Sequence, residues 1–138
     1  MSAWETLVTR RSVLASAIAG HVAAVAAGIR PAHAASGVTL VMVEEPGCPY
    51  CAKWDREIAP AYANSPEGRF APLVRVRRGN PDIAHIKGLN YSPTFLVMRG
   101  QEKIGRITGY PGADFFWALL DELLVKAGFE VAPTASGR

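Results

Sequence analysis

The stretch Glu45-Pro46-Gly47-Cys48-Pro49-Tyr50-Cys51 holds both cysteines of the 138-residue chain, and the predicted fold is built outward from it. The apolar run Val38–Val43 before it predicts a buried strand, and the residues after it predict a helix with Pro49 at the first position. A Cys-x-x-Cys pair on such a turn indicates redox chemistry. The helix N-terminus would stabilise a Cys48 thiolate, the attacking species in disulfide exchange. Cys51 lies one turn further on, where it can attack the mixed disulfide and release the substrate.

Residues 1–34 are predicted to be a signal peptide. Arg10-Arg11 end a short polar head, residues 12–29 are weakly apolar, and small residues at the cleavage positions end at Ala34. The alternative is a membrane anchor, which needs about 20 strongly apolar residues. This run is rich in alanine and interrupted by His21, so we expect cleavage near Ala34.

The segment Thr9–Leu14 resembles the twin-arginine export motif, although it lacks an aromatic residue at Val13 and a basic one at Ala15. The general secretory route therefore stays open. Either route leads to a bacterial periplasm, where disulfides persist and a reduced cysteine pair needs a dedicated partner.

The charge of the chain gives no support to nucleic-acid binding. The formal net charge is +3, but from Ala35 onward the chain has 12 basic and 11 acidic residues. The basic group Arg75, Arg77 and Arg78 is best interpreted as the solvated face of a strand. We therefore predict no nucleic-acid partner.

Residues 35–130 are predicted to form a single domain, with the elements in the order strand, helix, strand, short helix, strand, strand, helix. The predicted elements are strand 38–43, helix 52–62 with Pro60 bending or ending it, strand 73–77, short helix 83–87, strands 95–98 and 103–108, and helix 113–127. Residues 64–68 are predicted to be a loop and residues 131–138 a flexible tail. The first two strands flank a crossover helix, and the last two can pair as an antiparallel hairpin.

The aromatic residues divide into a packing group and a surface group. Trp54, Phe116 and Trp117 are predicted to pack the helices against the sheet. The apolar face of the last helix is predicted to consist of Phe116, Leu119, Leu120, Leu123 and Leu124. Tyr50 and Tyr110 lie on turns near Cys48 and are predicted to be at the surface.

Three features give the chain a resemblance to the thioredoxin superfamily that covers nearly all of residues 35–130. They are the Cys-Pro-Tyr-Cys motif between strand and helix, Ser92-Pro93-Thr94 before the penultimate strand, and Gly109-Tyr110 between the last strand and the last helix. The resemblance implies an α/β fold. It would be a minimal thioredoxin-like fold, with a mixed sheet flanked by helices and without the first strand and helix of full-length thioredoxin.

The same resemblance implies the roles of the site residues. Cys48 would be the nucleophile, Cys51 the resolving cysteine and Pro93 a cis-proline facing both. The backbone of Ser92 would pair with a substrate strand. The expected substrate-binding set is Pro49, Tyr50, Ser92, Thr94, Gly109 and Tyr110. No cofactor is expected beyond the Cys48–Cys51 disulfide.

The chain departs from thioredoxins in two places that bear on the chemistry. Met42 occupies about the position where thioredoxins bury an acidic residue beneath the second cysteine. Glu44 and Glu45 are the nearby candidates for proton transfer. The dipeptide between the cysteines is Pro-Tyr, as in many glutaredoxins.

A narrower resemblance is to the small periplasmic thioredoxins of bacterial sulfur-oxidation (Sox) systems. It rests on Glu44–Cys51, on Trp54-Asp55 with Glu57–Tyr62, and on Gly109–Trp117. It implies a reductant of cysteines in a partner protein, with Sox carrier proteins as the candidate partners. A membrane electron-transfer protein would recharge the oxidised pair.

Other functions stay open at this point. They are a glutaredoxin-like activity, a disulfide oxidase or isomerase, and a binding module without redox chemistry. A structural disulfide is disfavoured because so short a loop removes little entropy from the unfolded chain. A zinc site needs four ligands, and His85 would be the only histidine left after cleavage, so no metal is expected.

Overall fold

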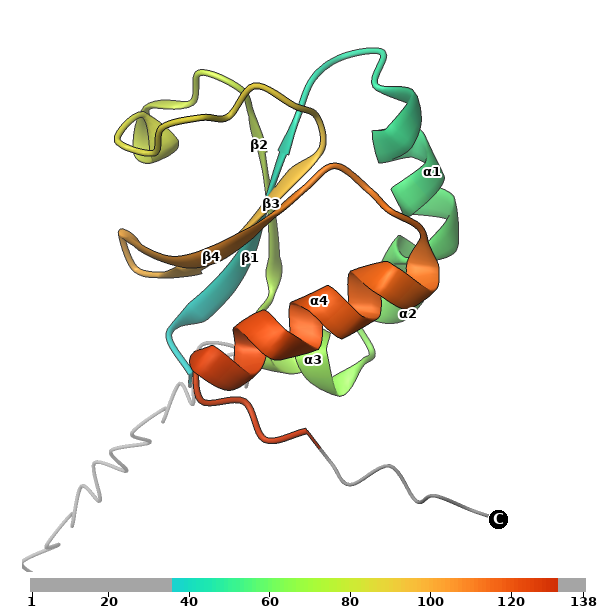
Figure 1. Ribbon diagram of the computed structural model, residues 1–138, viewed down its shortest axis with the longest axis vertical. Coiled ribbons are helices and arrows are strands. Elements are labelled where there is room, and N and C mark those ends of the chain that lie inside the picture. Colours follow the sequence, from blue (N-terminus) through green and yellow to red (C-terminus); the bar gives the residue numbers. More distant parts are fainter. Residues whose placement is uncertain (1–35, 132–138) are drawn as a thin grey trace, which may run out of the picture.

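The computed structural model describes residues 36–131, which form a four-stranded sheet with helices packed against it (Figure 1). The elements in chain order are β1 (Val38–Glu44), α1 (Pro49–Glu57), α2 (Ala59–Tyr62), α3 (Pro66–Phe70), β2 (Leu73–Arg77), a 3-10 helix (Pro81–Ile83), β3 (Thr94–Arg99), β4 (Glu102–Thr108) and α4 (Ala113–Lys126). The predicted signal peptide and most of the predicted tail lie outside the described residues. No helix within residues 36–131 is long and apolar enough to span a bilayer.

The sheet has the strand order β2-β1-β3-β4 and is mixed. β1 is parallel to its neighbour β2 and antiparallel to its neighbour β3, and β3 and β4 form an antiparallel hairpin. These pairings confirm the predicted mixed sheet of a thioredoxin-like fold. They also make β1 a central strand of the sheet. Cys48 follows the carboxyl end of β1 and therefore lies beyond that end of the strand.

The continuous apolar pattern of β1 is explained by burial on both faces of the sheet. Leu40 and Met42 belong to a core cluster with Trp54 of α1 and Phe116 of α4. The alternate residues of β1 belong to a second cluster, which the segment around the 3-10 helix covers. Figure 1 shows α1 and α4 on one side of the sheet and this segment on the other.

The predicted packing role of the aromatic residues is confirmed. Trp54 is fully buried, and its ring centroid lies 5.4 Å from that of Phe95 and 5.8 Å from that of Phe116. Trp117 stacks on Tyr62 with 6.0 Å between ring centroids. These contacts fix α1 and α4 against β3, and so fix the helix that carries the cysteines.

Pro49 lies in the first turn of α1, as predicted, so the helix begins before the predicted range 52–62. The predicted effect of Pro60 is also confirmed: the helix breaks at Ile58, because Pro60 cannot donate a backbone hydrogen bond. One loop prediction is wrong. The predicted loop 64–68 contains the start of α3, since the Ser65 side chain accepts a hydrogen bond from the Gly68 amide at 2.9 Å.

Two further predictions are wrong. The predicted helix 83–87 is only the 3-10 helix Pro81–Ile83, which is capped by Asn80. Leu119 was assigned to the apolar face of α4 but is exposed, whereas Phe116, Leu120 and Leu124 are buried. The buried positions recur every four residues, a narrower stripe than the sequence pattern indicates.

The close contact between Gly68 of α3 and Tyr62 of α2 can be tested by mutation. A Cβ there would overlap the backbone carbonyl oxygen of Tyr62, which cannot move as a side chain would. We expect Gly68→Ala to lower the free energy of unfolding by about 3 kcal/mol or more. Gly79→Ala is the control: Gly79 has a φ of +85° but nothing within 4 Å, so strain alone should cost about 1–2 kcal/mol. Urea denaturation measures the free energy of unfolding of both variants. Equal losses would contradict the close contact between Gly68 and Tyr62.

Candidate active site

The turn between β1 and α1 positions Cys48 at the N-terminus of α1. Gly47 has a φ of +74°, which favours glycine, and Pro49 occupies the first helical turn. Cys48 is the N-cap residue, and its Sγ accepts a hydrogen bond from the Cys51 backbone amide at 3.1 Å. One helix N–H group, that of Cys51, therefore points at Cys48 Sγ.

Cys51 is bonded to Cys48 in a disulfide, with the two Cα atoms 5.3 Å apart. Cys48 is half-buried, whereas Cys51 is only 6% exposed. The exposed member of the pair is thus the one at the helix N-terminus. The Cys51 Sγ also lies 3.5 Å from the Ser92 hydroxyl, which brings the predicted proline loop into direct contact with the cysteines.

The peptide bond between Ser92 and Pro93 is cis, the geometry that the resemblance implied. Pro93 is buried, and its carbonyl oxygen accepts a hydrogen bond from the Gly109 amide at 2.7 Å. The Thr94 hydroxyl donates to the Tyr91 carbonyl oxygen at 2.7 Å. These bonds join the proline loop to the turn after β4 and hold both beside the disulfide.

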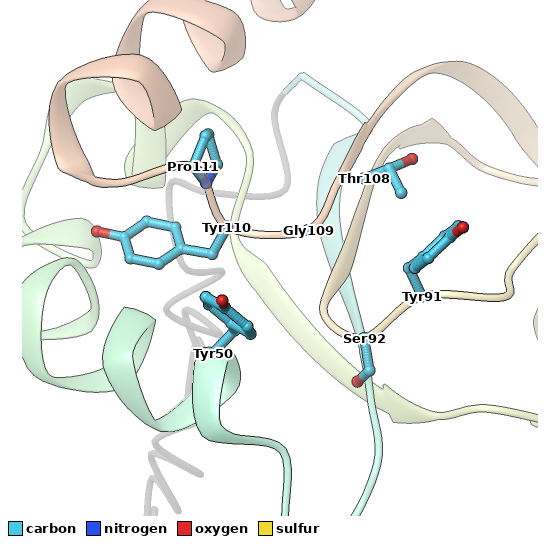
Figure 2. Close-up of a pocket in the computed structure, with 7 residues that line it drawn as sticks. All are labelled: Tyr50, Tyr91, Ser92, Thr108, Gly109, Tyr110 and Pro111. Atoms are coloured by element: carbon cyan, nitrogen blue, oxygen red, sulfur yellow. The ribbon is translucent and has the colours of Figure 1, made fainter.

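A cleft of about 510 Å³ lies between these loops and the start of α1. Its lining residues are all uncharged: Tyr50, Tyr91, Ser92, Thr108, Gly109, Tyr110 and Pro111. Figure 2 shows Tyr50 and Tyr110 on one side of this neutral cleft, Tyr91 and Thr108 on the other, and the Gly109 backbone between them. Neither cysteine lines the cleft, but two of its lining residues lie next to Cys51. Tyr50 precedes Cys51 in the sequence, and the Ser92 hydroxyl lies 3.5 Å from Cys51 Sγ.

Two predicted substrate-binding residues are placed differently from expectation. Tyr110 was predicted at the surface but is 6% exposed, and its hydroxyl donates to Glu57 at 2.6 Å. Burial, followed by this hydrogen bond, raises the pKa of Tyr110, so the phenol stays protonated. Thr94 is buried with its hydroxyl turned to Tyr91, and its side chain does not line the cleft. Tyr50, by contrast, is exposed as predicted.

A second cleft, of about 490 Å³, lies on the β2 side of the disulfide and is charged. Arg75 contacts Glu44 at 3.0 Å and also pairs with Asp55. The hydrogen bond to Asp55 is the main cause that raises the pKa of Arg75. Glu45 pairs with Arg78 at 3.1 Å. Two arginines of the basic group therefore form ion pairs with acidic residues around the active site.

Three residues near the cysteines lie outside the site predicted from the sequence. Tyr91 is 67% exposed and lines the neutral cleft, and its position two residues before Pro93 was the available signal. Asp55 and Arg75 line the charged cleft, and only the pairing of β1 with β2 brings them together. Among residues 36–131, no three His, Cys, Asp or Glu side chains are grouped to hold a metal ion.

Comparison with known proteins gives a consistent result. Residues 26–124 match the family model of the thioredoxin-like domain. The crystal structure of the periplasmic thioredoxin SoxS from Paracoccus pantotrophus, in its reduced form, is 44% identical over 65% of this chain and 98% of that chain, with a TM-score of 0.61.

A second solved structure, Trxlp from Edwardsiella tarda EIB202, is 24% identical over 67% of this chain and 86% of that chain, with a TM-score of 0.49. Comparison with curated proteins gives no match. The region that matches the family model contains all four strands and both cysteines. The chain therefore belongs to the thioredoxin-like family, and its bonded cysteine pair makes it a thiol–disulfide oxidoreductase.

Proposed function

We propose that this protein works in the periplasm, where it reduces a disulfide or a blocked cysteine of a partner protein in sulfur oxidation. The observation that carries the proposal is the hydrogen bond from the Cys51 amide to Cys48 Sγ at the start of α1. The 44% identity with a periplasmic thioredoxin named SoxS supports the compartment and the process. The candidate partners are Sox carrier proteins, and a membrane thiol protein would return the electrons.

In the first step, the Cys48 thiolate attacks a sulfur of the partner disulfide. A bond forms between Cys48 Sγ and that sulfur, and the other partner sulfur leaves with the electron pair as a thiolate. The helix N-terminus favours the charged form of Cys48, because the Cys51 N–H group and the partial positive charge of the helix end point at the sulfur. Cys48 is also the more exposed of the two cysteines, so it is the one that a protein substrate can reach.

In the second step, Cys51 attacks Cys48 Sγ and displaces the reduced partner. Cys51 is buried, which penalises its charged form. The Ser92 hydroxyl is within hydrogen-bond reach of Cys51 Sγ, at 3.5 Å for a sulfur atom, and can donate to the thiolate. Ser92 would thus assist resolution through its side chain, in addition to the expected pairing of its backbone with substrate.

The neutral cleft is the proposed docking site for the segment that flanks the partner's cysteine. Its exposed tyrosines, Tyr50 and Tyr91, offer apolar surface with polar tips. Because no charged side chain lines it, the cleft suits an uncharged peptide better than glutathione, which carries two carboxylates and an ammonium group. This disfavours the glutaredoxin-like alternative.

The role of Ser92 can be tested in a Cys48→Ala background, where Cys51 is the only cysteine of the chain. Adding Ser92→Ala should slow alkylation of Cys51 near neutral pH by roughly threefold to tenfold, the effect of losing one hydrogen bond of about 1 kcal/mol. Ser65→Ala, which removes the N-cap hydroxyl of α3 and leaves the surroundings of Cys51 unchanged, is the control for a general loss of stability. An unchanged rate in the Ser92 variant would show that its hydroxyl does not stabilise the thiolate.

The docking site can be tested with Tyr50→Ala. We expect the KM for a protein disulfide to rise about tenfold, a typical loss for one exposed aromatic anchor, with no change for a small disulfide. Phe115→Ala is the matched control, because Phe115 is 70% exposed on α4 but does not line the cleft. Equal losses on both substrates would refute a docking role for Tyr50.

The proposed function is tested directly with a purified Sox carrier protein whose cysteine is blocked as a mixed disulfide. The wild-type protein should restore the free thiol, and Cys51→Ser should remain covalently attached to the carrier through Cys48. Cys48→Ser should form no adduct, because the nucleophile is missing. A wild-type protein that reduces a small disulfide but leaves the carrier blocked would contradict the proposed partner.

A further inference from the structure

The loop between β2 and β3 carries Tyr91 into the wall of the neutral cleft and ends at the cis-proline. It spans residues 78–93, and within that range the 3-10 helix is the one regular element. Two buried isoleucines in and near the 3-10 helix anchor its first half in the second core cluster. In its second half, residues 87–91 are exposed apart from Leu89, which packs at the edge of that cluster. The half next to the cleft therefore has few apolar contacts to hold it.

Arg106 of β4 attaches this half of the loop to the sheet. Its Nη1 donates to the Gly88 carbonyl oxygen at 3.0 Å, and its Nη2 donates to the Lys87 carbonyl oxygen at 2.8 Å. A guanidinium presents its donors in a rigid planar fork, so bonds to two successive carbonyl groups fix the direction of the chain as well as its distance. The backbone of residues 87–90 makes no other hydrogen bond within the described part of the chain.

The register of the sheet explains how Arg106 reaches the loop. Its register partner on β3 is Leu96, which is fully buried in the second core cluster. Register partners in an antiparallel pair point their side chains to the same face, so Arg106 extends over the face that the loop covers. Gly88 allows the close approach: it has a φ of +74°, and a Cβ there would lie 3.4 Å from Arg106 Nη1. Both the strand register and the glycine therefore favour this contact.

The contact joins two segments that form one side of the neutral cleft. Arg106 comes two residues before Thr108, and Gly88 comes three residues before Tyr91. Thr108 and Tyr91 lie on the same side of the cleft (Figure 2). The end of the loop is attached separately, by the hydrogen bond between the cis-proline and the turn after β4. Tyr91 therefore stands between two points of attachment, and Arg106 provides the first of them.

We propose that Arg106 is a positioning residue for partner docking, which fixes residues 87–92 so that Tyr91 is held at the wall of the neutral cleft. The inference rests on the docking site proposed above. Arg106 does not line the cleft, so it acts on the partner through the loop. Without its two hydrogen bonds the loop samples other conformations. The observed affinity for a partner then falls in proportion to the fraction of molecules that keep the docking conformation.

The kinetics of Arg106→Gln with two substrates test this role. Insulin serves as the protein disulfide, with dithiothreitol recharging the protein, and 5,5′-dithiobis(2-nitrobenzoate) serves as the small disulfide in single turnover. We expect the KM for insulin to rise about threefold to tenfold, with kcat and the rate on the small disulfide within about twofold of wild type, because Cys48 and α1 are untouched. An unchanged KM for insulin would overturn the proposal.

Two further variants separate positioning from general effects. Arg99→Gln is the matched control, because the Arg99 guanidinium also donates to a backbone carbonyl oxygen, that of Ala127 at 2.7 Å, but at the other end of the sheet. It should leave the KM for insulin unchanged, and an equal rise there would overturn the proposal. Arg106→Lys keeps the positive charge but lacks the planar fork, so its KM should stay close to that of Arg106→Gln. A wild-type KM in Arg106→Lys would assign the effect to charge and would also overturn it.

A double-mutant cycle with Tyr91→Ala separates the inference from the docking site on which it rests. Tyr91→Ala should itself raise the KM for insulin, and adding Arg106→Gln should then raise it by less than about twofold more. An unchanged KM in Tyr91→Ala would refute docking in the neutral cleft, and the inference with it. A rise in Tyr91→Ala but not in Arg106→Gln would refute the inference alone. Fully additive effects would show that Arg106 does not act through Tyr91, and would also overturn the proposal.

Backbone dynamics test the attachment itself, whatever the substrate. In Arg106→Gln, the ¹⁵N order parameters of residues 88–91 should fall from about 0.85, typical of rigid backbone, to about 0.6 or below. Those of β3 should stay at the wild-type values. Unchanged order parameters in residues 88–91 would show that the loop is held without Arg106, and would overturn the proposal.

Discussion

The active site depends on the fixed direction of the first turn of α1. One backbone amide of that turn points at Cys48 Sγ, and the geometry of the turn sets which cysteine is exposed and which is buried. Trp54, one turn after Cys51, anchors this helix to β3 and α4 through aromatic contacts. The chemistry at one end of α1 is therefore stabilised by core packing in its middle. The bend after Glu57 lies beyond both features and leaves them undisturbed.

Around this turn, the fold places two clefts of different character. The neutral cleft is built from the start of α1, the loop before β3 and the turn after β4, and it exposes tyrosines and backbone. The charged cleft is built from β1, β2 and the side of α1, and it exposes paired acids and arginines. In our account the neutral cleft recognises the partner protein.

Much of this arrangement could be predicted from sequence because local patterns determine it. The apolar run of β1, the glycine before Cys48 and Pro49 after it mark a strand-to-helix turn without tertiary information. The α3 helix was not predicted because its N-cap Ser65 and its first residue Pro66 are residue types that also occur in loops. Tyr110 was predicted to be exposed because it lies on a turn. In the structure it is buried, and its hydroxyl donates a hydrogen bond to Glu57, which is distant in sequence.

The charged cleft shows most clearly what sequence alone leaves out. From the sequence, Arg75 is predicted to lie on a solvated strand face, because it alternates with the apolar residues Val74 and Val76. Its contacts with Glu44 and Asp55 span 31 and 20 residues, and they follow from the register of a parallel strand pair. No local pattern specifies that register. The ion pairs of Arg75 can therefore be predicted only once the pairing of β1 with β2 is known.

The central claim is that Cys48 and Cys51 form a cycling couple poised to reduce other proteins. The most direct test is the reduction potential of the pair, measured by thiol trapping in dithiothreitol buffers. The account predicts a value near that of thioredoxin, about −270 mV. A value near about −120 mV would make the protein an oxidant and reverse the proposed electron flow. A pair that does not equilibrate with dithiothreitol would contradict the redox role altogether.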